Sequence, residues 1–217
     1  MNSPIVIIGI GEMGAVFARG LLRLGHPVFP VPRGIDPHKV TDTFPDPEAV
    51  LVAVAESDLD QVLQQMPESW KEKVCLLQNE LLPQDWRGYN TPTVISVWFE
   101  KKRGQDSKVI IPSPAYGPKA RLLEEALGSL NIPVRILDNE QQLLFELVVK
   151  NLYILTSNIA GLRTGGSVGE LWANHEAFAR EVAGDIIDIQ EALTGESLDR
   201  KALLTTMLTA FNGDPDH

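Results

Sequence analysis

The sequence predicts an α/β protein in which a parallel β-sheet domain is followed by a small all-helical domain. Short runs rich in Val and Ile alternate with amphipathic stretches in the first part of the chain, an order typical of parallel sheets. From residue 140 onward no further strand is apparent, and helical stretches follow one another. We therefore place the boundary near Asp138, with domains at residues 1–138 and 139–217.

Seven segments have the composition of strands, because each is short, apolar and rich in β-branched residues. They are residues 4–9, 27–31, 50–54, 74–78, 93–97, 109–111 and 134–137. Residues 12–24 and 59–66 predict amphipathic helices between the early strands, and Ser57 and Asp58 are suitable caps for the second. Strand and helix in alternation indicate a parallel sheet with right-handed connections.

Four helices are expected in the second domain, at residues 140–162, 168–173, 175–193 and 199–211. The first is long and mostly apolar, so it needs burial on most of its sides. It is expected inside a helical domain, where a second subunit would help to bury it. The sequence thus favours a homodimer.

Composition excludes several classes of function. The 217 residues carry a net charge of −10, which opposes extended binding of nucleic acid. No stretch approaches the ~20 uncharged apolar residues of a membrane span, so a cytoplasmic location is expected. Cys75 is predicted to be a buried strand residue. No pair of histidines has metal-ligand spacing, and no Ser-His-Asp arrangement is apparent, so neither a metal site nor a hydrolase is expected.

Gly9, Gly11 and Gly14 form a G-x-G-x-x-G turn between the first strand and the first helix. The first glycine permits a tight turn, the second lets a pyrophosphate approach the backbone, and the third allows helix and strand to pack closely. The helix N-terminus then favours negative charge. The turn, which also contains Glu12 and Met13, predicts a dinucleotide-binding domain of the Rossmann type. A glycine-rich turn without a ligand is the alternative.

The end of the second strand indicates which dinucleotide binds. No acid stands there to accept a ribose 2′-hydroxyl; instead, Arg33 follows the strand, with His38 and Lys39 close behind. A guanidinium can hold a 2′-phosphate in a forked geometry, which favours NADP. Asp36 lies slightly further on and is the candidate ribose partner of an NAD site, so both cofactors stay open.

Lys150 is the candidate catalytic residue of the second domain. It lies among apolar residues on the long helix, where burial would lower the pKa of its ammonium group toward a working range. Asn158 follows about 12 Å further along the axis, and Ser157 is almost in line with Lys150. A long lysine and a short amide can converge on one small molecule. A lysine that reaches water and an asparagine at a kink are the structural alternative.

In order and spacing, these features resemble the ketopantoate reductase (2-dehydropantoate 2-reductase) family from Ile5 to about Leu193. The matching pieces are the GIGEMG turn, Arg33 after GHPVFPVP, LLQN ending at Asn79, and the Lys150 to Asn158 spacing followed by AGL.

The resemblance implies a Rossmann domain followed by a helical domain similar to that of 6-phosphogluconate dehydrogenase. It implies NADPH-dependent reduction of a small 2-oxo acid to the 2-hydroxy acid. Lys150 would polarise the ketone and donate the proton, Asn158 would hold the substrate, and Asn79 would lie near the nicotinamide ribose.

The chain departs from the family pattern at several positions. Ala55 stands where members often have a lysine, Glu80 replaces the glycine that usually follows the asparagine, and Ile154 replaces a polar residue of the catalytic helix. Members also supply a late glutamate that binds the substrate hydroxyl. The acids left for that role are not at the corresponding distance: Glu170, Asp185, Asp188 and Glu191. The ending FNGDPDH therefore suggests a fragment or a shortened relative.

Two other readings remain open. The opening sequence also suits enzymes similar to 3-hydroxyisobutyrate dehydrogenase, but their catalytic helix has an asparagine four residues after the lysine, where this chain has Ile154. A non-catalytic NADP-binding dimer is favoured by Ala55 and by the missing glutamate, whereas Lys150 and Asn158 argue against it.

Overall fold

The computed structural model describes residues 2–78 and 81–217 and contains a seven-stranded sheet of order β2-β1-β3-β4-β5-β8-β9. Its strands are β1 (Ile5–Ile8), β2 (Val28–Val31), β3 (Ala49–Val52), β4 (Val74–Gln78), β5 (Thr93–Ser96), β8 (Ser113–Tyr116) and β9 (Val134–Ile136). All neighbours pair in parallel except β5 and β8. The predicted parallel sheet is confirmed apart from this one antiparallel pair.

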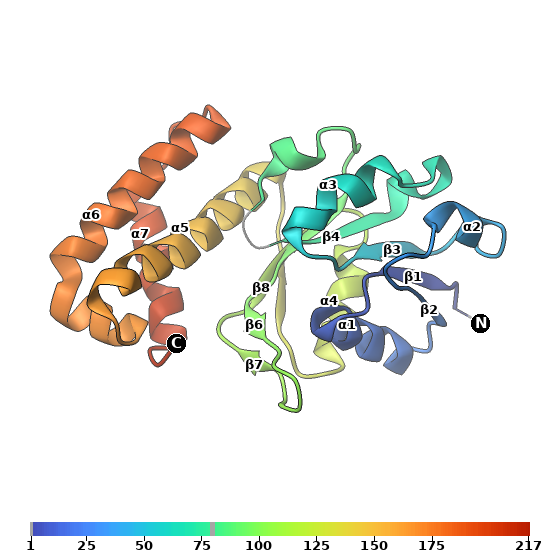
Figure 1. Ribbon diagram of the computed structural model, residues 1–217, viewed down its shortest axis with the longest axis horizontal. Coiled ribbons are helices and arrows are strands. Elements are labelled where there is room, and N and C mark those ends of the chain that lie inside the picture. The colour runs from blue at the N-terminus through green and yellow to red at the C-terminus, as the bar shows by residue number, and fades with distance from the viewer. Residues whose placement is uncertain (1, 79–80) are drawn as a thin grey trace. The chain divides into compact units, whose positions relative to one another are not determined.

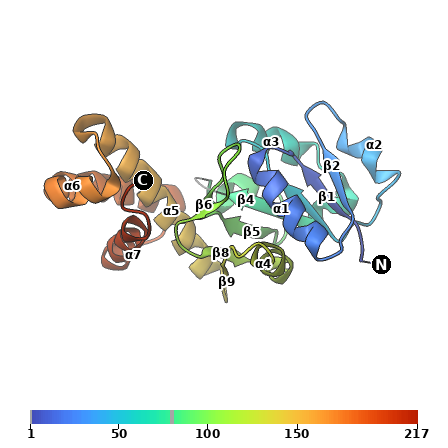
Figure 2. The same cartoon turned by 90° about the horizontal axis from the view of Figure 1, so that it is seen from below.

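Helices cover both faces of this sheet (Figures 1 and 2). They are α1 (Glu12–Arg23), α2 (Pro37–Thr41), α3 (Glu56–Gln64) and α4 (Ala120–Gly128), with 3-10 turns at Glu68–Lys73 and Pro83–Trp86. α1 and α4 lie side by side, and α3 lies on the opposite face. Gly20 permits the close approach of α1 and α4, since a Cβ there would lie under 3.0 Å from the carbonyl oxygen of Ala126.

In the strand order, the connections that leave β1 and β3 run toward opposite edges of the sheet. From β1 the chain moves to β2 on one side, and from β3 it moves to β4 on the other. β1 and β3 are buried along their whole length, which holds their carboxyl ends in fixed positions. Open α/β sheets bind ligands at such a point, because the loops there diverge and leave a crevice.

Some local predictions were wrong. β8 pairs antiparallel with β5, and it lies outside the predicted strands, as does β6 (Phe99–Glu100), which forms a two-stranded ribbon with β7 (Lys108–Val109). α3 begins at Glu56 with Ala55 as its N-cap and no side-chain capping bond. Ser57 and Asp58 are therefore not its caps. Asp58 is already inside the first turn, and its carboxylate pairs with an arginine elsewhere.

The chain forms two compact units, residues 1–143 and residues 144–217. The second unit contains most of α5 (Glu140–Thr164), together with α6 (Val168–Thr194) and α7 (Arg200–Gly213). α6 spans the two shorter helices that were predicted, and the expected break between them is a kink at His175, where the backbone leaves helical geometry. Ser167 and Glu170 form a capping box at its start, which satisfies amide groups that the helix itself cannot.

Aromatic rings and one buried amide pair hold the second unit together. The ring of Tyr153 in α5 lies 5.3 Å from that of Phe211 in α7, and Trp172 in α6 lies 6.4 Å from the same ring. Between α5 and α6, Asn151 donates a 3.0 Å hydrogen bond to Gln190, and both residues are buried.

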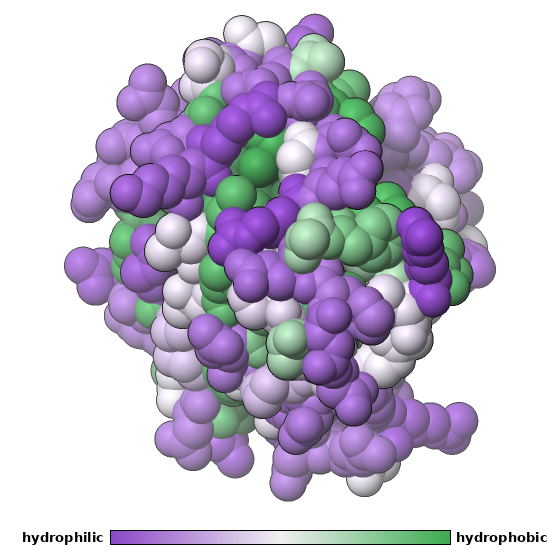
Figure 3. Space-filling view, turned by 90° about the vertical axis from the view of Figure 1, so that its left-hand side faces the viewer, coloured by the Kyte–Doolittle hydropathy of each residue, from purple (hydrophilic) through white to green (hydrophobic). Residues whose placement is uncertain are grey.

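α5 is long and apolar enough to cross a membrane, but 61% of its most apolar window is buried in the structure. The core helix of a soluble protein has the same property, so the finding is weak evidence for a membrane span. Figure 3 shows hydrophobic side chains between hydrophilic ones on the side where α6 lies. The large hydrophobic residues that are exposed in this unit are Ile159, Leu162, Ile189 and Leu193.

Candidate functional site

Glycine is required at two positions, one in the loop between β1 and α1 and one in the first turn of α1. Gly9 has a φ of +88°, and a Cβ there would lie under 3.0 Å from the carbonyl oxygen of Ala53 at the end of β3. A Cβ on Gly14 would approach the carbonyl oxygen of Gly9 equally closely. The turn is thus packed against β3, with no room for a side chain at either position.

Gly11 differs from these two glycines. Its φ of −70° is ordinary, and a Cβ would meet nothing within 4 Å. It is the N-cap of α1, and no side chain caps this helix end. Because the first amide groups of a helix have no partner inside it, they can donate to an anion placed beside Gly11. The fold itself does not need glycine at position 11, and the space beside this residue is open to a ligand.

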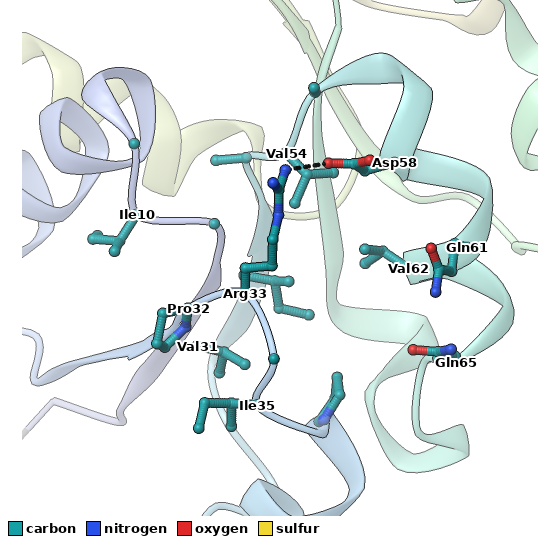
Figure 4. A pocket seen from close by; sticks show the side chains of 17 residues that line it. Ile10, Val31, Pro32, Arg33, Ile35, Val54, Asp58, Gln61, Val62 and Gln65 are labelled. Carbon is teal, nitrogen blue, oxygen red and sulfur yellow. Dashed lines mark hydrogen bonds and ion pairs between the residues drawn. The ribbon is translucent and has the colours of Figure 1, made fainter.

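A pocket of about 710 Å³ lies at the carboxyl ends of β1, β2 and β3 (Figure 4). Ile10, Val31, Ile35, Val54 and Val62 give it apolar walls. Such walls suit the flat faces of an aromatic base, since ligand pockets are mostly apolar with a few polar groups that fix orientation. Those polar groups are Arg33, which follows β2, and residues of the α3 segment.

Arg33 reaches across this pocket from the end of β2. Its Nη2 lies 2.8 Å from Oδ2 of Asp58 in the first turn of α3 (Figure 4), and its side chain is 90% exposed. Gln61 adds an amide group one turn further along α3, and Gln65 adds another at the C-cap of that helix. Sequence reasoning missed these three residues of the α3 segment as parts of the site, although the segment that follows the end of β3 was a usable signal.

Asp36 caps the short helix α2 in this structure. Its carboxylate accepts a 2.9 Å hydrogen bond from the backbone amide of His38. Asp36, His38 and Lys39 are not among the described residues that line the pocket, whereas Arg33 is.

The other residues of the predicted turn have different surroundings. Met13 packs partly buried against the core of the first unit. Glu12 is half exposed, and its carboxylate lies 3.5 Å from the ammonium group of Lys101, which precedes the ribbon turn. Ala55, at the position where ketopantoate reductases often have a lysine, lines the pocket with a methyl group.

The predicted catalytic residues of the second unit lie on α5. Lys150 is buried, with 6% of its surface exposed, and its ammonium group is 5.6 Å from the centre of the Tyr153 ring. Asn158 is exposed two turns later, about 12 Å along the axis. Ser157 donates a 3.0 Å hydrogen bond to the carbonyl oxygen of Ile154. Asn79 lies outside the described residues, as does Glu80.

The four acids considered for the role of the late glutamate have structural partners or face solvent. Glu170 closes the capping box of α6, whereas Asp185 is exposed. Asp188 and Glu191 both pair with Arg200. Hydrogen bonds from the backbone amide of Leu198 and from Arg200 lower the pKa of Glu191. These contacts explain the acids without a substrate.

Cys75 is buried in β4, and desolvation raises the pKa of its thiol to about 12. Because the thiolate is the reactive form, this cysteine is inert at neutral pH.

No protein-family model matches the sequence. A search of curated protein sequences finds no match either.

Solved structures, in contrast, match along nearly the whole chain. A 2-dehydropantoate 2-reductase from Methylococcus capsulatus has a TM-score of 0.67 at 15% identity, covering 96% of this chain and 79% of the other. A dimeric ketopantoate reductase from Staphylococcus aureus has a TM-score of 0.67 at 17% identity, covering 98% and 81%.

A D-mandelate dehydrogenase in complex with NADH and anilino(oxo)acetate matches with a TM-score of 0.66 at 14% identity, covering 96% of this chain and 80% of the other. The chain therefore has the fold of ketopantoate reductases, a Rossmann-like domain followed by a helical domain.

Proposed function

We propose that the protein is an NADPH-dependent reductase that converts a small 2-oxo acid into the 2-hydroxy acid. The observation that carries the proposal is the closely packed glycine turn, which opens into the 710 Å³ pocket crossed by Arg33. A dinucleotide needs these features together: an uncapped helix N-terminus for its pyrophosphate, apolar walls for adenine and a cation near the 2′-position. The neighbouring structures named as ketopantoate reductases and D-mandelate dehydrogenase support the reaction class.

The cofactor site is assigned to the first unit. Gly11 and the start of α1 would hold the pyrophosphate, with Gly9 and Gly14 fixing the turn and Glu12 and Met13 continuing it. Arg33 would hold a 2′-phosphate, because a guanidinium matches phosphate oxygens in a forked geometry. The bound nicotinamide would supply the hydride. Asn79 is proposed to lie near its ribose.

Lys150 is proposed to be the proton donor. A buried ammonium group that donates to the carbonyl oxygen would stabilise the negative charge that develops there, which is the largest contribution in many enzymes. Burial also favours the neutral amine left after the proton has moved. Asn158 is proposed to bind the substrate through its exposed amide. We also propose that the protein is cytoplasmic and forms a homodimer.

The decisive experiment follows the oxidation of NADPH and NADH with a panel of 2-oxo acids. Wild type is compared with Lys150→Ala and with Lys201→Ala, an exposed lysine of α7 that serves as the matched control. Loss of a general acid is expected to lower kcat by on the order of 10²–10⁴, while the control keeps wild-type rates and Lys150→Ala keeps its cofactor affinity.

Binding of the cofactor without turnover of any oxo acid would instead support a non-catalytic NADP-binding protein. Full turnover by Lys150→Ala would refute the role of the lysine even if the reductase assignment survived. A protein that binds neither dinucleotide would refute the proposed function as a whole.

A further inference from the structure

Two opposite charges face each other across the pocket at the ends of β2 and β3. Arg33 and Asp58 are 25 residues apart in the sequence, and a single 2.8 Å contact between Nη2 and Oδ2 joins them. They come from different walls, one following β2 and the other belonging to α3 (Figure 4). Their contact is therefore a property of the folded pocket and not of a local turn.

These two side chains are the charged groups among the described residues that line the pocket. The lining thus carries no net formal charge, although it contains an arginine. A pocket built only for a phosphate would be expected to carry excess positive charge, since phosphate binding depends on cations. Here the carboxylate of Asp58 lies within hydrogen-bonding distance of the group that would bind the phosphate.

We propose that Asp58 determines cofactor specificity, and that its pairing with Arg33 lets the pocket accept NADH as well as NADPH. This inference rests on the proposed function, because it concerns the same dinucleotide site. Arg33 attracts the 2′-phosphate of NADPH, while Asp58 limits that attraction. For NADH, which has a neutral 2′-hydroxyl, the ion pair stays intact.

The size of the opposing effect follows from electrostatics. A phosphate on one edge of a guanidinium and a carboxylate on another are on the order of 6 Å apart, given charge-assisted hydrogen bonds on both sides. A phosphate monoester carries nearly two negative charges at pH 7. In a water-like dielectric, partly screened by salt, repulsion at that distance corresponds to roughly three- to tenfold in Kd.

The same carboxylate can serve NADH. The ion pair uses Oδ2 of Asp58, so Oδ1 can accept a hydrogen bond from a ribose 2′-hydroxyl. Arg33 is highly exposed, so it can turn from the carboxylate toward a phosphate at little cost in packing. One pair of side chains thereby offers an acceptor for a hydroxyl and a donor for a phosphate.

The test is a titration of NADPH and NADH against wild type and Asp58→Asn, followed by the fluorescence of the reduced nicotinamide. The asparagine keeps an oxygen acceptor and removes the charge. We expect wild type to bind the two cofactors within about tenfold of each other. Asp58→Asn should bind NADPH roughly three- to tenfold more tightly, with the affinity for NADH changed by less than about twofold.

Asp60→Asn is the matched control, because Asp60 lies on the same helix but is not among the described residues that line the pocket. Its carboxylate accepts a hydrogen bond from the side-chain amide of Gln64. The substitution should leave both affinities unchanged. Raising the salt concentration should shrink the effect of Asp58→Asn, since screening weakens the repulsion. Arg33→Gln should weaken NADPH binding selectively.

The inference fails if Asp58→Asn leaves the ratio of the two affinities unchanged, or if it weakens NADPH binding, which would mean that the carboxylate only orients Arg33. A wild-type preference for NADPH above about tenfold would also overturn it. Absence of binding by either cofactor to wild type would refute the proposed function itself, so the two failures are distinguishable.

Discussion

Gly11→Ala should separate the stability of the fold from the binding of a dinucleotide. At this position the backbone is in an ordinary region, and an added methyl group meets no atom within 4 Å. Alanine restricts the unfolded chain, which is favourable, and is a poorer N-cap than glycine, which is unfavourable. The free energy of unfolding should therefore stay within about 1 kcal/mol of the wild-type value.

Binding should respond differently. The methyl group would project beside the first amide groups of α1, where the pyrophosphate is proposed to lie. Loss of one charge-assisted hydrogen bond costs about 1.5–3 kcal/mol, which corresponds to about 10–150-fold in Kd. NADPH and NADH should be affected alike, because both contain the pyrophosphate.

Gly14→Ala is the contrasting variant. Its Cβ would lie under 3.0 Å from the carbonyl oxygen of Gly9, so this substitution should lower the free energy of unfolding by about 1–3 kcal/mol. Urea denaturation measures the stability of both variants, and fluorescence titration measures their affinity. Our assignment of the phosphate site would be refuted if Gly11→Ala bound both cofactors as tightly as wild type does.

Three further predictions concern stability and reactivity. Gly20→Ala should destabilise the fold by about 1–3 kcal/mol in urea, because its methyl group would meet a backbone carbonyl of α4, whereas Gly184→Ala, in open space within α6, should stabilise by up to about 1 kcal/mol. The Cys75 thiol, with its pKa raised to about 12 by burial, should resist alkylation at neutral pH until the protein is unfolded; rapid native labelling would contradict this. The pKa of Glu191 is lowered below the ordinary value of a glutamate by the amide of Leu198 and then by Arg200, which begins α7. Its contribution to stability should be present above that value and lost as the pH falls through the folded pKa, so stability measured across this range should fall less in Glu191→Gln.

Local patterns in the sequence were sufficient for much of the sheet. β1 and β3 are buried runs of Ile, Leu and Val, whose composition alone favours strands. β8 has the sequence SPAY, which lacks such a pattern. It is a strand because β5 and β9 hydrogen-bond to it on both sides. Such a strand depends on tertiary pairing, which a reading of local composition does not contain.

The site divides in the same way. The glycine turn was predicted because its spacing along the chain is a local pattern, and two of its glycines, Gly9 and Gly14, stand where the fold leaves no room for a Cβ. The contact of Arg33 with Asp58 was not predicted, because it joins two crossover connections, and Asp58 had been assigned to a helix cap. A polar residue near a helix start suits both roles, and only the folded positions of β2 and α3 distinguish them.

The buried amide pair between α5 and α6 has a consequence for the orientation of the long helix. Successive side chains on a helix differ by about 100° in direction, so a helix that turned by one residue would separate Asn151 from Gln190 and leave two amides without each other in an apolar interior. Such a loss costs about 1–3 kcal/mol per group. Apolar contacts alone would penalise a rotation of the helix less, because they are not directional. The pair therefore selects one rotational setting of α5. Because Lys150 precedes Asn151 on α5, the same hydrogen bond also sets the direction in which the lysine side chain points within the second unit.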